Sequence, residues 1–231
     1  MKLDTLKALN AARNSRIACV LVTSLDDGDD TLFTENDMPE DHFKEAVEKC
    51  LRTGKSGTTE IEGKEYFLNA HLPPVRLIVI GAVHISQALA PMAKMTGYDM
   101  EVIDPRTAFA TSERFEGVPV YADWPEDILK DRPLDAYCAL AAVTHDPKID
   151  DYPLAEALKA NCFYVGALGS KKTHAKRVSR LTEEGVSDEQ INRVNAPIGM
   201  DIGAASPQEI AVAVMAEIIS AFRKRGLGEV E

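Results

Sequence analysis

The segment Thr144-His145-Asp146 has the residue types best suited to acid–base or hydrogen-bonding chemistry. It ends a long apolar run and is followed by Pro147 and the acidic pair Asp150-Asp151. A histidine beside a carboxylate can exchange a proton, ligate a metal ion or hydrogen-bond a ligand. No second histidine or cysteine stands at ligand spacing, so we predict no metal site. The alternative is that Asp146-Pro147 simply begins a turn.

A second segment, from Gly166 to His174, has the composition of an anion site. It combines two glycines, Gly166 and Gly169, with the hydroxyl of Ser170 and two lysines that begin at Lys171. Backbone donors and cations of this kind suit a phosphate or another anion. The spacing differs from the GxxxxGK[ST] pattern of a Walker loop, so ATP hydrolysis is not indicated. The alternative is a flexible loop with solvated lysines.

The six residues from Gly81 to Ser86 follow one predicted strand and open a predicted helix, where a dinucleotide-binding fingerprint reads GxGxxG. Only the first glycine, Gly81, is present. A side chain at Val83 hinders the usual pyrophosphate pose, although the helix N-terminus can still attract an anion. His84 either contacts a ligand there or is an ordinary first residue of the helix.

Asp104-Pro105-Arg106 ends the next predicted strand, roughly 20 residues after Gly81. An acidic residue at this distance commonly receives the hydroxyl pair of a ribose. Arg106 beside it can hold a phosphate. The alternative is a simple turn with a solvated arginine.

The loop from Pro197 to Ala204 contains mainly small and apolar residues and carries one carboxylate, Asp201. It precedes a helix that we expect to begin at Pro207, after a capping box that starts at Ser206. The loop either closes over a ligand or is plain packing, and propensity does not decide between the two.

These segments are expected to meet because short apolar strands alternate with amphipathic helices after the Pro73-Pro74 pair. That alternation predicts an α/β fold with a Rossmann-like parallel sheet and flanking helices, in which ligands bind at the carboxyl ends of the strands. We place this domain at residues 73–231 and a small α+β domain at residues 1–72. The predicted strands of the larger domain are Arg76 to Ile80, Met100 to Ile103, Val118 to Tyr121, Ala136 to Val143 and Phe163 to Val165, and its helices are Ile85 to Thr96, Asp151 to Ala160, Lys172 to Glu184 and Pro207 to Arg223.

Composition excludes several classes of protein. The chain of 231 residues is 45% apolar and carries a net charge of −11, the wrong sign for a protein that tracks nucleic-acid phosphates. No apolar run reaches the length of a signal peptide's core or of a membrane span, so we predict a cytoplasmic protein with no membrane partner. The four cysteines are widely spaced and lack a CxxC pair, as expected for reduced, buried thiols.

Three of the segments together strongly resemble the carboxy-terminal domain of the XdhC/CoxI family, in order and spacing. They are Thr144 to Pro147 with Asp150-Asp151, Phe163 to Ser170 with Thr173-His174, and Ala196 to Gly199 with Asp201 to Gly203. The resemblance covers roughly residues 75–222. It implies a Rossmann-like domain in a factor that binds molybdenum cofactor, promotes its sulfuration and delivers it to xanthine dehydrogenase-like molybdenum hydroxylases.

The resemblance also sets the expected site, partners and ligand. The cofactor-binding residues would be Gly81, His84, Asp104, Arg106, Thr144, His145, Asp146, Gly166, Gly169, Ser170, Lys171 and Asp201. A molybdenum hydroxylase is the expected client, with a sulfurtransferase and a second copy of the chain as further candidate partners. The family implies a maturation factor more than a catalyst, and leaves open whether molybdopterin carries a nucleotide. The competing hypotheses are an NAD(P)-dependent oxidoreductase and a nucleotide-sensing regulatory domain.

Two departures from the family pattern bear on ligand binding. Family members usually read GAGH where this chain has Gly81-Ala82-Val83-His84, so the first loop is altered. Full-length members also carry an amino-terminal domain with a Gly-Gly-Cys segment, which residues 1–72 lack. We therefore expect weaker binding, a different ligand, or a separate partner that supplies the missing segment.

Overall fold

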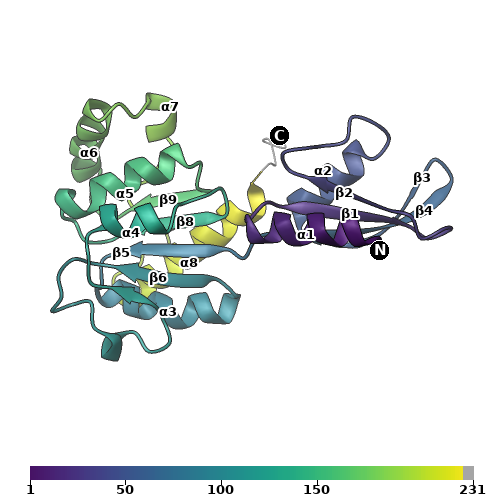
Figure 1. The fold of residues 1–231 in the computed structure, drawn as a ribbon. Helices are drawn as coiled ribbons and strands as arrows, with labels where there is room; N and C mark the ends of the chain where they lie inside the picture. Colours follow the sequence, from purple (N-terminus) through teal and green to yellow (C-terminus); the bar gives the residue numbers. More distant parts are fainter. Residues whose placement is uncertain (226–231) are drawn as a thin grey trace. The chain divides into compact units, whose positions relative to one another are not determined.

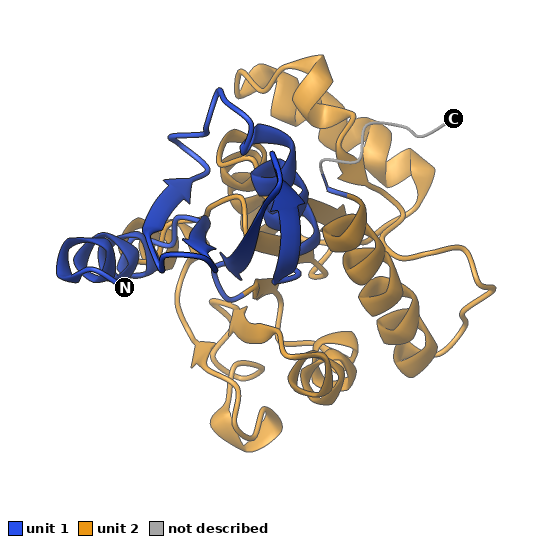
Figure 2. Ribbon diagram, turned by 90° about the vertical axis from the view of Figure 1, so that its right-hand side faces the viewer, with its two compact units in different colours: residues 1–74, 225–231 blue, residues 75–224 orange. Residues whose placement is uncertain are grey.

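The computed structural model describes residues 1–225, and these form two compact units (Figure 2). The smaller unit comprises residues 1–74 and the larger one residues 75–224. The division falls next to the proline pair at which the sequence pattern changes. The last residues of the predicted larger domain, 226–231, lie outside the described part of the chain. No helix within residues 1–225 is both long and apolar enough to cross a membrane.

The smaller unit is an antiparallel sheet with two helices. The strand order is β2-β1-β4-β3, with β1 (Cys19–Ser24) and β4 (Lys64–His71) in the centre, and β2 (Asp30–Thr34) and β3 (Gly57–Ile61) at the edges. Helix α2 (Lys44–Thr53) packs Val47 and Cys50 on Val20, Val22 and Leu68 of the sheet. The unit thus combines helices with strands, as expected for the small α+β domain.

Helix α1 (Leu3–Asn14) is an element that the sequence pattern does not predict. Its apolar residues are few, and charged residues interrupt them. The helix buries Leu9 and Ala12 beside Cys19, on a small cluster of its own. Tertiary packing therefore stabilises a segment whose amphipathic pattern is weak.

The larger unit has a six-stranded parallel sheet in the order β10-β9-β8-β5-β6-β7. Figure 1 labels the four central strands, β9, β8, β5 and β6, in this order. The first strand, β5, lies beside both β6 and β8, which is the dinucleotide-binding strand order 3-2-1-4-5-6. The prediction of a Rossmann-like parallel sheet is confirmed. The strands are β5 (Arg76–Ile80), β6 (Asp99–Ile103), β7 (Val120–Tyr121), β8 (Cys138–Ala142), β9 (Tyr164–Ala167) and β10 (Val194–Asn195).

Helices cover both faces of this sheet because its central strands are apolar on both sides. Helices α3 (His84–Thr96) and α8 (Pro207–Lys224) pack on the face that includes Leu77 and Val79. Helices α5 (Pro147–Lys159) and α6 (Lys171–Glu183) pack on the face that includes Ile78 and Ile80. The remaining helices are α4 (Pro125–Asp131), α7 (Asp188–Ile191) and a short 3-10 turn at Ser112–Arg114.

Helix α5 begins four residues earlier than the sequence pattern predicts. Asp146 is its N-cap, and the Asp146 carboxylate accepts a hydrogen bond from Lys148 N. Pro147 occupies the first helical position, where its missing N–H costs nothing. Helix α4 is not predicted by the sequence pattern, and it also has a proline, Pro125, at its first position.

Candidate functional site

The predicted ligand-contacting segments follow β5, β6, β8, β9 and β10, so they share the carboxyl edge of the parallel sheet. Strand order reverses between β5 and β8, and Gly81 and Thr144 meet there. A Cβ on Gly81 would lie 2.7 Å from Cγ2 of Thr144, and Gly81 has a φ of +116°. Glycine at this position is required both by the backbone angle and by the close approach of the neighbouring turn.

The turn from Gly81 to Val83 uses most of its polar backbone groups within the protein. Ser86, which is fully buried, donates its hydroxyl to Gly81 O. Arg114 Nη1 donates to Ala82 O at 2.9 Å. Val83 is the N-cap of α3, and His84 begins the helix with its side chain exposed. The altered fingerprint is thus an internally bonded turn in which Ser86 replaces the third glycine.

Asp104 is fully buried at the end of β6 and has no oxygen left for a ribose in this conformation. Its Oδ2 accepts from Ala82 N at 2.8 Å and from Arg106 Nη2 at 2.7 Å. Its Oδ1 accepts from N and Nε of Arg106, both at 2.9 Å. Burial alone would raise the pKa of Asp104, but these hydrogen bonds together hold it below its usual value. Asp104 ties the β6 turn to the β5 turn, and a ribose contact stays a prediction.

The turn after β8 presents His145 to solvent. His145 has a φ of +67°, a left-handed angle that few non-glycine residues adopt. Thr144 Oγ1 accepts from Asp146 N at 2.9 Å and donates to Asp150 Oδ1 at 2.7 Å. The exposed imidazole is therefore held on a turn whose hydroxyl is anchored to the buried start of α5.

The turn after β9 leads into α6 and carries the predicted anion-binding residues. Ser170 is the N-cap of α6 and accepts from Thr173 N, while Gly169 has a φ of +132°. Lys171 is exposed at the first turn of the helix. Gly166, in contrast, is buried within β9. Gly166 is a packing residue, and the exposed groups that can meet an anion are those at the start of α6.

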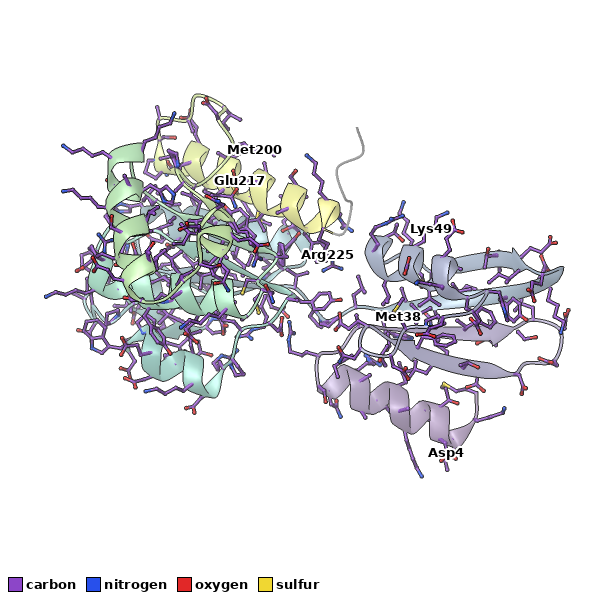
Figure 3. All side chains as sticks on the ribbon, turned by 90° about the horizontal axis from the view of Figure 1, so that it is seen from above. Asp4, Met38, Lys49, Met200, Glu217 and Arg225 are labelled. Carbon is purple, nitrogen blue, oxygen red and sulfur yellow. The ribbon has the colours of Figure 1, made fainter. Side chains whose placement is uncertain are left out.

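The loop after β10 is fastened to the sheet and to α8. Ile198 N donates to Ala167 O at 3.1 Å, and Met200 N donates to Ala213 O. Glu217 Oε2 accepts from Gly199 N at 2.8 Å and from the Tyr164 hydroxyl at 2.6 Å. Figure 3 labels Glu217 on α8 and Met200 in this loop. Asp201 follows with its side chain exposed, so the loop positions a carboxylate in solvent.

Two charged residues near this edge that are almost completely buried are absent from the predicted set. Asp150 on α5 is 1% exposed, and Arg177 on α6 is 2% exposed. The sequence does contain a signal for Arg177. It lies one helical turn before Leu181, on the face of α6 that packs on the sheet, so its burial could have been predicted. His174, also on α6, has a buried Nδ1 without a hydrogen-bond partner. The structure thus places buried charge directly beneath the exposed ligand loops.

A family model described as the XdhC Rossmann domain matches residues 77–218. The chain belongs to the XdhC family. The match runs from β5 into α8 and includes the segments on which the resemblance rests. The Rossmann unit of residues 75–224 is therefore an XdhC Rossmann domain.

Three bacterial proteins are similar to this XdhC family member. A probable xanthine dehydrogenase subunit of Bacillus subtilis (strain 168) is 34% identical over 160 residues, covering 69% of this chain and 46% of that protein. The uncharacterized protein YqeB of Escherichia coli (strain K12) is 33% identical over 165 residues, covering 66% and 28%. The molybdenum cofactor insertion chaperone PaoD of the same strain is 32% identical over 148 residues, covering 64% and 40%. The matched segment spans less than half of each relative.

A solved structure has the same fold. It is described as a xanthine dehydrogenase from Bacillus halodurans, and it superposes with a TM-score of 0.64 at 22% identity. The similarity covers 96% of this chain and 65% of that one. At this identity, the superposition establishes the fold alone.

The buried carboxyl of the XdhC Rossmann domain makes its stability depend on pH. Burial raises the pKa of Asp150 to about 6, against the opposing effects of Thr144 and Arg177. The folded protein therefore binds more protons than the unfolded chain between about pH 4 and pH 6, and this contribution is lost as the pH rises through 6. We expect the free energy of unfolding, relative to that of an Asp150→Asn variant, to fall by roughly 1 kcal/mol from pH 5 to pH 8. Urea unfolding of both proteins at the two pH values measures this, and an unchanged difference would contradict it.

Proposed function

We propose that this protein binds molybdenum cofactor and assists its sulfuration and its insertion into a xanthine dehydrogenase-like molybdenum hydroxylase. The observation that carries the proposal is the convergence of the three family segments on one edge of the sheet. Ile198 N donates to Ala167 O, Gly81 packs against Thr144, and Ala82 N donates to Asp104, so each of the five loops contacts a neighbouring one. Such an edge at a change of strand order is where α/β sheets bind ligands.

The groups at this edge suit a ligand with an anionic tail and a polar heterocycle. Helix α6 presents its N-terminus together with the exposed Lys171, and α3 presents its own N-terminus at His84. Helix N-termini and cations favour phosphate groups. We place the phosphate or nucleotide tail of the cofactor along these strand ends. His145, with Asp146 beside it, would lie over the pterin end as a hydrogen-bonding group.

Two relatives support this role by name, since one is a molybdenum cofactor insertion chaperone and another a probable xanthine dehydrogenase subunit. We infer a binding and delivery role, in which the client enzyme performs the chemistry. A sulfurtransferase that supplies sulfur and a second copy of the chain are the further partners in this proposal. Binding of NAD(P) is the alternative. Both oxygens of Asp104 already accept hydrogen bonds from Ala82 and Arg106, which argues against the contact that an acidic residue here usually makes with the ribose of NAD(P).

The test is titration of the purified protein with anaerobically released molybdenum cofactor, with NAD and NADP as parallel ligands. We expect pterin fluorescence and molybdenum to co-elute with the protein in stoichiometric amounts. A ligand that binds the native state also raises the midpoint of thermal unfolding. Stabilisation by NAD or NADP, without co-elution of pterin, would refute the proposal and favour the oxidoreductase or nucleotide-sensing class.

His145→Ala tests the placement of the pterin. The side chain is exposed, so we expect the variant to fold with an unchanged unfolding midpoint. Loss of a ligand hydrogen bond should weaken cofactor binding by about tenfold. The measurement is the same co-elution titration, with His42→Ala as a control, because His42 is an exposed histidine of the smaller unit outside the predicted ligand segments. Equal affinities for the His145 variant and the unchanged protein would remove this role.

A further inference from the structure

Asp150 and Arg177 are almost completely buried, yet each has unused hydrogen-bonding capacity. Asp150 Oδ2 has no hydrogen-bond partner, and neither do Nε and Nη1 of Arg177. Buried charged groups normally have their hydrogen bonds satisfied, because an unpaired buried charge is costly. These three atoms therefore call for an explanation.

The neighbouring pair on the same two helices shows that α5 and α6 can close such a contact. Asp151, next to Asp150, accepts hydrogen bonds from Nε and Nη2 of Arg180, three residues after Arg177. Asp150 and Arg177 influence each other's charge, but no ion pair joins them in the described structure. One Asp–Arg pair between these helices is closed, and the other is left open.

The open pair lies at the ligand loops. Asp150 Oδ1 accepts from Thr144 Oγ1 at 2.7 Å, which fixes the turn that carries His145. Arg177 Nη2 donates to Leu168 O at 3.0 Å, in the turn that leads to Ser170. Each residue of the pair therefore hydrogen-bonds one of the two loops, and each has at least one further polar atom without a hydrogen-bond partner.

The combination of charges selects the kind of group that fits. The negative charge of Asp150 would repel a phosphate, and the positive charge of Arg177 would repel a metal ion, so neither fits this pair. A planar ring edge with an N–H or amino donor next to a carbonyl acceptor satisfies both residues at once. The 2-amino-4-oxo edge of a pterin has this arrangement.

We propose that Asp150 and Arg177 form the subsite that recognises the amino and carbonyl edge of the pterin. Asp150 accepts hydrogen bonds from the amino group and the adjacent ring N–H, and Arg177 donates to the carbonyl oxygen. The free atoms are covered in this structure, so admission of the ring requires the turn at Thr144 to move away from α5. This inference rests on the proposed function and assigns residues to it.

The experiment compares cofactor affinity in the unchanged protein and in Asp150→Asn, Arg177→Met and Asp151→Asn variants. Thermal unfolding first shows that each variant is folded at the pH of the titration. We expect at least a tenfold loss of affinity for released molybdenum cofactor in the Asp150 and Arg177 variants, because the site would leave a ligand group unpaired. Asp151→Asn is the matched control, because Asp151 lies on the same helix and pairs with Arg180, and its affinity should stay within about threefold.

Competition by two simple heterocycles separates recognition from a merely structural effect. Lumazine has a carbonyl where pterin has the 2-amino group, so the unchanged protein should prefer pterin as a competitor of cofactor binding. The Asp150→Asn amide can donate to that carbonyl, so this variant should lose or reverse the preference. Cofactor binding that is equal in all variants, or an unchanged preference, would overturn the subsite and leave the proposed function standing. Absence of cofactor binding by the unchanged protein would overturn both.

Discussion

Asp104→Asn is expected to lower the free energy of unfolding of the Rossmann unit by about 3 kcal/mol. Both oxygens of the fully buried carboxylate accept hydrogen bonds, and all of the donors belong to Ala82 and Arg106. An amide at this position directs its N–H groups at other donors and leaves the Arg106 guanidinium without its counter-charge. Arg106 is only partly exposed, with 35% of its side-chain surface accessible, so water compensates incompletely.

Urea unfolding measures this loss, with Asp99→Asn as the control. Asp99 begins the same strand, β6, but its side chain is exposed. Its substitution should change the free energy of unfolding by less than about 0.5 kcal/mol. If the two variants were equally stable, the buried Asp104 network would not fasten the β5 and β6 turns together.

Gly166→Ala is expected to destabilise the same unit by about 2 to 3 kcal/mol. The added Cβ would lie 2.5 Å from the Tyr164 hydroxyl and 2.7 Å from Cγ1 of Ile198. Tyr164 cannot easily move, because it is buried and its hydroxyl is bound to Glu217. The collision therefore pushes on the loop after β10, and the proposed cofactor binding should weaken together with stability.

A double variant tests this explanation. Ile198→Ala removes the two Ile198 carbons that the new Cβ would meet and leaves the Tyr164 hydroxyl, so it relieves part of the collision. The costs of Gly166→Ala and Ile198→Ala should therefore sum to more than the cost of the double variant. Contacting residues usually couple by 0.5 to about 3 kcal/mol in such a cycle. Gly57→Ala is the control, since a Cβ there meets nothing within 4 Å. Strictly additive costs would show that Gly166 does not keep space open for Ile198.

The local pattern of the chain predicts the elements of the Rossmann unit well, because each strand is a short apolar run and most helices have a capping residue or a terminal glycine. Strand β5 coincides with its predicted range, and α8 starts at the predicted proline. The pattern fails where packing compensates for weak local signals. Helix α1 buries only Leu9 and Ala12, and β10 is a two-residue strand that exists through its pairing with β9.

The candidate site follows the same division. The positions of His145 and Lys171 at strand ends could be predicted, because strand ends in a parallel sheet share one edge. The hydrogen bond from Ala82 N to Asp104 could not be predicted, because it joins residues of two turns that are far apart in the sequence. Asp146 belongs to a family segment and is also the N-cap of α5, and only the structure shows the second role.

The amino-acid sequence by itself determined the family, the alternation of strands and helices, and the segments that reach the carboxyl edge of the sheet. These are encoded by side-chain type and spacing within short windows. The tertiary structure decided which of those groups are free to meet a ligand. It closed Asp104 on Arg106 and left Asp150 and Arg177 buried and incompletely bonded. Hydrogen-bond satisfaction depends on the separation of residues from different elements, and that separation is fixed only when the helices pack on the sheet.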